Sequence, residues 1–250
     1  MEYEIQLKNL KKKYPGGIDA LRGIDLTIGK GRLYALLGPN GAGKSTLVKI
    51  MTTLVRKESG EILIGGMNPE TRFTEVRKHI GVALQENELD PTEMVFSLLL
   101  FQGRLFGMSK QEATTRANEL IELFQLTTEK EKKAETLSGG NKRRLHCALA
   151  LVHRPRVLFL DEPTVGMDPL ARATFWEVIT SLNQQEGVTV LVTTQYLEEA
   201  DKFASEMALI NEGTIRFTGT VSEFKAMVHP AEESSLEESY LKYIRSFTKS

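Results

Sequence analysis

The chain has 250 residues, of which 41% are apolar and 26% charged, as expected for a globular protein with a sizeable core. Its net charge is −1, so no overall basic field favours nucleic acid or a membrane surface as its partner. Cys147 is the only cysteine, which excludes an intrachain disulfide, and no apolar run approaches the ~20 residues that a spanning helix needs.

Apolar and polar residues alternate over residues 3–7 and again over residues 24–28. This alternation predicts two strands, and the sequence Tyr14-Pro15-Gly16-Gly17 predicts a turn between them. Tyr14 lies 24 residues before Gly38, where a phosphate-binding pattern begins, so its ring could stack on the base of a bound nucleotide. A tyrosine beside Pro-Gly-Gly is also a common turn residue, and both interpretations stand.

A phosphate-binding pattern, G-x-x-x-x-G-K-[ST], follows a short apolar run at residues 33–37. After it, apolar residues recur at helical spacing over residues 47–54, so the pattern lies between a strand and a helix, as it requires. Glycines let backbone N–H groups surround phosphate oxygens, and the helix N-terminus adds its positive end. We expect Lys44 to reach the β- and γ-phosphates and the Ser45 hydroxyl to ligate Mg²⁺. The loop comprises Gly38, Pro39, Asn40, Gly41, Ala42, Gly43, Lys44, Ser45 and Thr46.

A helical block interrupts the alternating β/α pattern. The pattern predicts a strand at residues 80–84 that ends at Gln85, and Ser109-Lys110-Gln111-Glu112 then has the form of a capping box. Apolar residues follow at helical spacing over residues 113–124, and the Lys- and Glu-rich residues 127–135 predict a solvated loop. We therefore predict a helical subdomain at about residues 86–140, inserted into the core.

The sequence Leu137-Ser138-Gly139-Gly140 precedes another helical pattern. A serine and two glycines at the start of a helix can bind an anion, whereas the simpler interpretation is that Ser138 only caps the helix. His146 and His153, farther along this helix, have no second type of metal ligand nearby. We interpret both as packing or surface residues.

Two acids end an apolar run at residues 157–160. A buried parallel strand delivers its functional residues at its carboxyl end, so Asp161 is a candidate Mg²⁺ ligand. Glu162 would lie beside the γ-phosphate and accept a proton from the attacking water. Farther on, Asp168 and Pro169 predict an N-cap and the first position of a helix.

Another apolar strand, at residues 188–192, ends in Thr193-Thr194-Gln195-Tyr196. Two short strands at residues 207–210 and 214–217 flank a turn, and residues 229–235 have the composition of a linker. The last helix has one apolar face, from Leu236 to Phe247. That face either docks on its own domain or offers a surface to a partner.

Together these motifs resemble those of ABC transporter ATP-binding subunits, in the same order and spacing, over residues 1 to about 225. The runs at residues 158–164 and 193–201 look most like daunorubicin-resistance-type ATPases, which partner ABC-2-type permeases in drug or antibiotic export. The matching motifs are the aromatic A-loop residue Tyr14, the Walker A loop at 38–46, the Q-loop residue Gln85, the signature at 137–140, the Walker B strand at 157–162 and the D-loop residues Met167-Asp168.

The resemblance implies an α/β fold with a P-loop NTPase core, an N-terminal antiparallel β subdomain and the inserted α-helical subdomain. It implies one ATP-binding domain at residues 1–228 and a C-terminal linker and amphipathic helix at 229–250. ATP would lie between the Walker A loop of one subunit and the signature of a second ATPase subunit, identical or different. An integral membrane permease would be the other partner, which places the chain at the cytoplasmic face of the membrane, and no nucleic acid is expected.

The resemblance also implies the role of each site residue. The catalytic residues would be Glu162, Lys44, Gln195 and Gln85, and the Mg²⁺ ligands Ser45, Gln85 and Asp161. ATP would also contact Tyr14, the Walker A loop, Ser138, Gly139, Gly140 and Asp168. Gln85 would connect the Mg²⁺ site to the helical block, where a permease helix docks.

Gln195 stands where the family usually has a histidine. A glutamine can donate a hydrogen bond to the γ-phosphate but carries no positive charge. Our hypothesis is that hydrolysis survives, supported by Glu162, Lys44 and Mg²⁺. The alternatives are an ATP-gated dimerising module with little turnover, and a soluble ABC ATPase that acts on ribosomes or DNA. The single cassette, the lack of heptads and the lack of basic excess disfavour the last.

Overall fold

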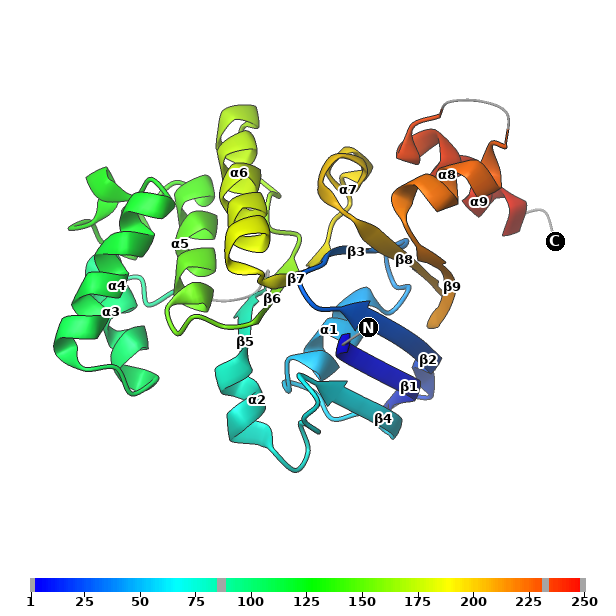
Figure 1. Cartoon of the computed structure of the whole chain (residues 1–250), viewed down its shortest axis with the longest axis horizontal. Helices are drawn as coiled ribbons and strands as arrows, with labels where there is room; N and C mark the ends of the chain where they lie inside the picture. Colours follow the sequence, from blue (N-terminus) through cyan, green and yellow to red (C-terminus); the bar gives the residue numbers. More distant parts are fainter. Residues whose placement is uncertain (1–2, 85–88, 231–233, 248–250) are drawn as a thin grey trace.

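The computed structural model describes residues 3–84, 89–230 and 234–247, in which two sheets are surrounded by helices (Figure 1). A three-stranded antiparallel sheet has the order β2-β1-β4, and a six-stranded mixed sheet has the order β5-β6-β7-β3-β8-β9. The predicted α/β class with a separate antiparallel sheet is confirmed. The strands are β1 (Tyr3–Tyr14), β2 (Ile18–Gly29), β3 (Leu33–Leu37), β4 (Ser59–Ile64), β5 (Ile80–Ala83), β6 (Val157–Asp161), β7 (Thr189–Thr193), β8 (Glu206–Asn211) and β9 (Thr214–Gly219).

The small sheet covers helix α1 (Lys44–Met51). In β1, Ile5 pairs with Ile28 on one side and Ile64 on the other, and all three side chains are buried. They form one apolar cluster with α1 and with one face of the large sheet. Helix α1 is thereby held between the two sheets, which fixes the direction in which its N-terminus points.

The central strands of the large sheet are buried on both faces. In β3, Tyr34 and Leu36 face the cluster around α1, whereas Leu33, Ala35 and Leu37 face a second cluster with the long helices. Strands β3, β5, β6, β7 and β8 run parallel, and only β9 is antiparallel. Parallel strands buried on both sides read as continuous apolar runs, as this sequence does. Helices α5 (Gly139–Leu151) and α6 (Pro169–Glu186) contribute to the second cluster.

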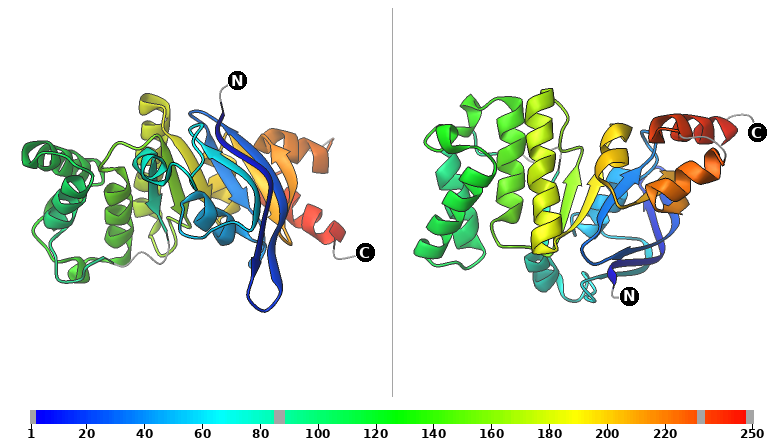
Figure 2. Two further views of the ribbon diagram at one scale, coloured as in Figure 1. Left: turned by 90° about the horizontal axis from the view of Figure 1, so that it is seen from below. Right: turned by 45° about the horizontal axis from the view of Figure 1, so that its top comes forward.

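Helices α3 (Val95–Leu105) and α4 (Lys110–Leu123) lie at one end of the molecule, opposite the C-terminal helices (Figures 1 and 2). The expected capping box is present: the Ser109 backbone N–H donates to Glu112 Oε2 at 2.7 Å, and Glu112 N–H donates to Ser109 Oγ at 3.2 Å. The two helices approach closely at Gly103, where an added Cβ would meet the Ala113 Cβ at 2.9 Å.

The prediction that residues 127–135 form a solvated loop is wrong in part. The segment contains 3₁₀ turns at Thr127–Glu129 and Ala134–Thr136, and Ala134 is buried. Its carbonyl groups accept hydrogen bonds from the start of α3, Val95 N to Lys132 O at 3.1 Å and Phe96 N to Lys130 O at 3.1 Å. The first N–H groups of a helix need such acceptors, which explains why this charged segment is held against the protein.

Two helices have no counterpart among the predicted elements. They are α2 (Phe73–His79), between β4 and β5, and α8 (Val221–Val228), which follows β9. The last helix, α9 (Leu236–Phe247), packs against α8 and against α7 (Leu197–Phe203). Leu236 is fully buried, and its N–H donates to Asp201 Oδ2 on α7 at 3.0 Å. Of the two interpretations of the amphipathic helix, the structure therefore supports docking on its own chain. No helix among the described residues has the length and apolar character to cross a membrane.

Candidate functional site

The phosphate loop connects β3 to α1, and its shape depends on glycine. An added Cβ at Gly38 would lie 2.1 Å from the Ile210 carbonyl oxygen, and one at Gly43 would lie 2.7 Å from the Ala20 carbonyl oxygen. Gly43 also has a φ of 109°, which L-residues rarely adopt. Among the residues that the structure describes, no side chain makes a capping hydrogen bond at the N-terminus of α1. Such an N-terminus is suited to bind an anion.

Lys44 is the first residue of α1 and is only 9% exposed. Its ammonium group donates to the loop carbonyl oxygens of Gly38 at 2.6 Å and Pro39 at 3.1 Å. Burial lowers the pKa of Lys44, and the nearby negative charges of Glu162 and Asp161 act in the opposite direction. The structure thus places the predicted lysine close enough to both predicted acids for their charges to act on it.

The two acids are anchored by the neighbouring strand. Asp161 is paired in register with Thr193 of β7, and its carboxylate accepts a hydrogen bond from the Thr193 hydroxyl. The Glu162 N–H donates to the Thr193 carbonyl oxygen at 3.0 Å and to its Oγ1 at 3.1 Å. Glu162 has a φ of 48°, in the left-handed region, so this turn is held in an uncommon conformation for a non-glycine residue. Thr193 is a site residue that sequence reasoning missed, because its role depends on the β6–β7 register.

Gln195 follows Thr193 closely and is exposed. The residues on either side of it are held: the Tyr196 N–H donates to Thr194 Oγ1 at 3.0 Å, and the Thr194 side chain is buried. The Gln195 side chain therefore projects from a fixed turn at the end of β7, the strand beside Asp161.

The Ser138 turn begins α5. The Ser138 hydroxyl accepts a hydrogen bond from the Asn141 N–H at 3.2 Å, which confirms its role as an N-cap. Ser138 and Gly139 are exposed, and an added Cβ on Gly139 would meet nothing within 4 Å. Within the described part of the chain, no hydrogen bond or ion pair joins residues 138–141 to the phosphate loop. Whether the turn also binds an anion remains a prediction.

Asp168 caps α6, as predicted. Its carboxylate accepts a hydrogen bond from the Ala171 N–H at 2.9 Å, and this bond is the main reason why the pKa of Asp168 lies below its usual value. The loop that leads to it lies beside the Ser138 turn, since an added Cβ on Gly140 would lie 3.9 Å from the Met167 side chain.

The structure adds little about two predicted site residues, Tyr14 and Gln85. Tyr14 ends β1 and is half-buried, with the Lys12 ammonium 5.2 Å from the centre of its ring. Stacking of Tyr14 on a nucleotide base stays a prediction. Gln85 lies outside the described residues.

The residues fit Mg²⁺ bound together with a phosphate ligand. No group of three or more His, Cys, Asp or Glu side chains in the described ranges could hold a metal by itself. Mg²⁺ uses oxygen ligands, keeps several waters, and is often bound through one or two carboxylates and the phosphates of a substrate. The Asp161 carboxylate and the Ser45 hydroxyl, which is exposed in the first turn of α1, supply such oxygens.

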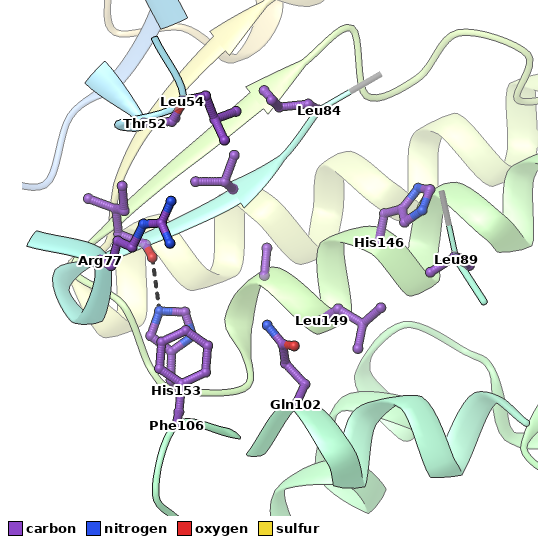
Figure 3. Close-up of a pocket in the computed structure, with 13 residues that line it drawn as sticks. Thr52, Leu54, Arg77, Leu84, Leu89, Gln102, Phe106, His146, Leu149 and His153 are labelled. Carbon is purple, nitrogen blue, oxygen red and sulfur yellow. Dashed lines mark hydrogen bonds between the residues drawn. The ribbon is translucent and has the colours of Figure 1, made fainter. Parts of the chain in front are cut away.

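A groove of about 350 Å³ lies between β5, α3 and α5, outside the phosphate loop (Figure 3). Apolar side chains such as Leu54, Leu89 and Leu149 line it together with Gln102. His153 stacks on Phe106 with ring centres 3.8 Å apart, and its Nε2 makes a 2.9 Å hydrogen bond with the Ile80 carbonyl.

His146 also lines this groove. Burial, with a smaller effect of the Arg143 charge, lowers the pKa of His146 from 6.5 to about 4. Neither ring nitrogen has a hydrogen-bond partner among the described residues. The prediction that His146 and His153 are packing or surface residues is confirmed.

Comparison with known proteins agrees with this geometry. The pattern of the family described as ABC transporter matches residues 21–165. A daunorubicin resistance ATP-binding protein of Streptomyces coeruleorubidus is 42% identical over 90% of this chain and 70% of its own length. A linearmycin resistance ATP-binding protein of Bacillus subtilis is 36% identical over 97% and 79%. A Nod factor export ATP-binding protein of Burkholderia lata is 41% identical over 84% and 68%.

Solved structures show the same fold. A dimeric ATP-binding cassette in a post-hydrolysis state, bound to ADP and Pi, superposes with a TM-score of 0.80 at 27% identity. The match covers 86% of this chain and 98% of the other. An ATP-binding subunit of an ABC transporter superposes with a TM-score of 0.86 over 95% of this chain, at 24% identity.

Proposed function

Because this chain belongs to the ABC transporter family and is an ATP-binding subunit with ATPase activity, we propose that it drives the export of a drug, antibiotic or other small molecule through a separate permease. The single observation that carries the ATPase part of this proposal is that Lys44, at the start of α1, lies near Asp161 and Glu162 at the end of β6. The family membership and the names of the resistance and export relatives support the export direction.

We propose roles for the site residues from the family's motifs, and the geometry of Lys44, Asp161 and Glu162 supports them. Lys44 and the N–H groups at the start of α1 bind and orient the phosphates. Glu162 accepts a proton from the attacking water, and the exposed Gln195 donates a hydrogen bond to the γ-phosphate. Ser45 and Asp161, together with Gln85, would hold Mg²⁺, which would neutralise charge on the phosphate oxygens. Tyr14 stacks on the base.

The second half of the site comes from another subunit. In this proposal Ser138, Gly139 and Gly140 would contact the γ-phosphate of a nucleotide on the partner subunit, and Asp168 would lie close by. Two features support this arrangement: the turn is exposed, and a solved neighbour is a dimeric cassette bound to ADP and Pi. Closure is then favoured by ATP, because only the closed state offers both halves of the site.

The permease would dock on the helical subdomain, at the groove of Figure 3. The groove is apolar, and Phe101 and Leu105 on α3 are 66% and 68% exposed. The chain would thus be a peripheral protein at the cytoplasmic face of the membrane.

Co-purification of the chain from native membranes, followed by identification of the bound integral membrane protein, tests the proposed permease partner. Recovery with ribosomes or DNA instead would favour the soluble alternative.

Phosphate release tests the central proposal. Loss of the general base in Glu162→Gln should lower turnover by roughly 10²- to 10⁴-fold, because general base catalysis contributes about that much. MgATP binding should persist. Glu177→Gln, an exposed acid on α6, is the matched control and should keep the wild-type rate. If wild type and Glu162→Gln release phosphate equally slowly, the chain is an ATP-gated module with little turnover.

A further inference from the structure

Glu199 is a buried acid that no role described above uses. It lies in the first turn of α7 and is only 4% exposed. A buried carboxylate is costly unless its oxygens are paired, so its partners indicate what it is there to hold.

Both carboxylate oxygens of Glu199 accept hydrogen bonds from buried threonines. Oε1 accepts from the Thr164 hydroxyl at 2.7 Å, and Oε2 accepts from the Thr194 hydroxyl at 2.9 Å. Arg172 on α6 places its Nε 3.7 Å from Oε1, and its guanidinium group lies 4.3 Å from the centre of the Tyr196 ring. One carboxylate therefore connects three segments of the chain.

These contacts lie next to two predicted catalytic residues, Gln195 and Glu162. Thr194 and Tyr196 flank Gln195, and the Thr194 hydroxyl that donates to Glu199 also accepts from the Tyr196 N–H. Thr164 lies two residues after Glu162, in the loop that leads to Asp168. The exposed Gln195 side chain thus projects from a turn that Glu199 ties to the loop after the catalytic acid.

We propose that Glu199 is a positioning residue for ATP hydrolysis, which holds the Gln195 turn in register with the Glu162 loop. This inference rests on the proposed function. Glu199 touches no nucleotide and acts through Gln195. A carboxylate suits the position, because it accepts from both threonines at once and carries the charge that faces Arg172. A glutamine has one acceptor oxygen, so one threonine hydroxyl would lose its acceptor.

The test compares Glu199→Gln with Glu198→Gln, the exposed acid next to it, in the full chain with its permease where that is required. Glu199→Gln should lower kcat by roughly ten- to a hundredfold, since small displacements of a positioning group cost about that much, while KM for ATP stays at the wild-type value. Glu198→Gln should leave both constants unchanged. Trp176, the only tryptophan, stacks on Phe203 at the end of α7 with ring centres 4.7 Å apart. An unchanged Trp176 emission spectrum therefore indicates that α7 remains packed.

A double-mutant cycle decides whether Glu199 acts through Gln195. If it does, Gln195→Ala and the double variant Gln195→Ala/Glu199→Gln should have the same kcat. Multiplicative losses would mean that the two residues act independently and would overturn the inference. A wild-type kcat in either single variant would overturn it as well.

A second pair of variants covers the case in which Glu199→Gln disturbs folding. Thr194→Val replaces the hydroxyl with a methyl group and should lower kcat, whereas Thr194→Ser keeps the hydroxyl and should keep most of the wild-type kcat. If Val and Ser give equal rates, the hydrogen bond to Glu199 has no role in hydrolysis. Absence of any Glu162-dependent turnover in the wild type would instead refute the proposed function itself, so the two failures are distinguishable.

Discussion

The phosphate loop and the Ser138 turn, the two regions proposed to contact ATP, differ in how much of their surroundings the chain itself supplies. Lys44 is buried, bonded to its own loop, and close to two acids that a neighbouring strand anchors. Ser138 and Gly139 are exposed, and within the described residues the Ser138 hydroxyl bonds only to the helix that it caps. The first region is assembled within one chain, whereas the second faces outward. A site shared between two subunits would need both: one half that is assembled within a chain, and one half that is exposed to a partner.

The largest effect should come from the assembled region. Lys44→Ala removes the ammonium group that is held against the carbonyl groups of the phosphate loop. Hydrogen bonds to charged groups contribute about 1.5–3 kcal/mol, so MgATP binding should weaken roughly 10- to 100-fold in equilibrium titration. Lys110→Ala, at an exposed lysine on α4, is the control. Wild-type affinity in Lys44→Ala would mean that the phosphates bind elsewhere.

A change in the outward region should give the opposite pattern. An arginine at Ser138 has room in the lone chain but would occupy the mating surface of the proposed dimer. In the Glu162→Gln background, which should accumulate ATP-bound dimer, Ser138→Arg is expected to leave the subunit monomeric by light scattering while binding MgATP as before.

Ser109→Arg is the matched control for this experiment, because Ser109 is also the N-cap of a helix. Loss of either cap costs about 1 kcal/mol of stability, so the two variants should be destabilised alike. Only Ser138→Arg should lose dimerisation. Dimers in both variants would contradict the assignment of the Ser138 turn to a partner's nucleotide.

The smallest effect concerns the interior of α5, the helix that carries the Ser138 turn. The pKa of His146 falls from 6.5 to about 4 on folding, so between these values the unfolded chain binds a proton that the folded chain does not. The free energy of unfolding should therefore fall as pH drops from 6.5 toward 4. His146→Gln should flatten this part of the profile of Tm against pH, measured by circular dichroism. Parallel profiles for the two proteins would show that His146 contributes nothing to it.

Structural features that depend on residues close together in the sequence could be predicted from it. The phosphate loop, the acids that end β6, and the caps Ser109 and Asp168 each depend on residues within a few positions of one another. Helix α8 carries such a signal too, since Thr220 and Glu223 form a capping box that was not recognised. The sequence of helix α2 carries little helical periodicity of apolar residues, because Val76 is the only residue of this helix that is buried.

Features that join distant segments could not be predicted. The bond between Thr193 and Asp161 depends on the pairing of β6 with β7, and the contact of Glu199 with Thr164 depends on where α7 packs. Likewise, the composition of the charged residues 127–135 predicts a solvated loop, because it does not reveal that their carbonyl groups bond to α3. The limits proposed for the domains and the role of Gln85 remain predictions.

Cys147, on α5, offers a practical advantage. Its thiol is buried, and burial raises its pKa to about 12, so it stays protonated and unreactive at neutral pH. The natural chain can therefore serve directly as the background for site-directed labelling. A cysteine introduced on any exposed helix would be the single attachment point for a fluorophore or spin probe, and distances between subunits could be followed without first removing a native thiol.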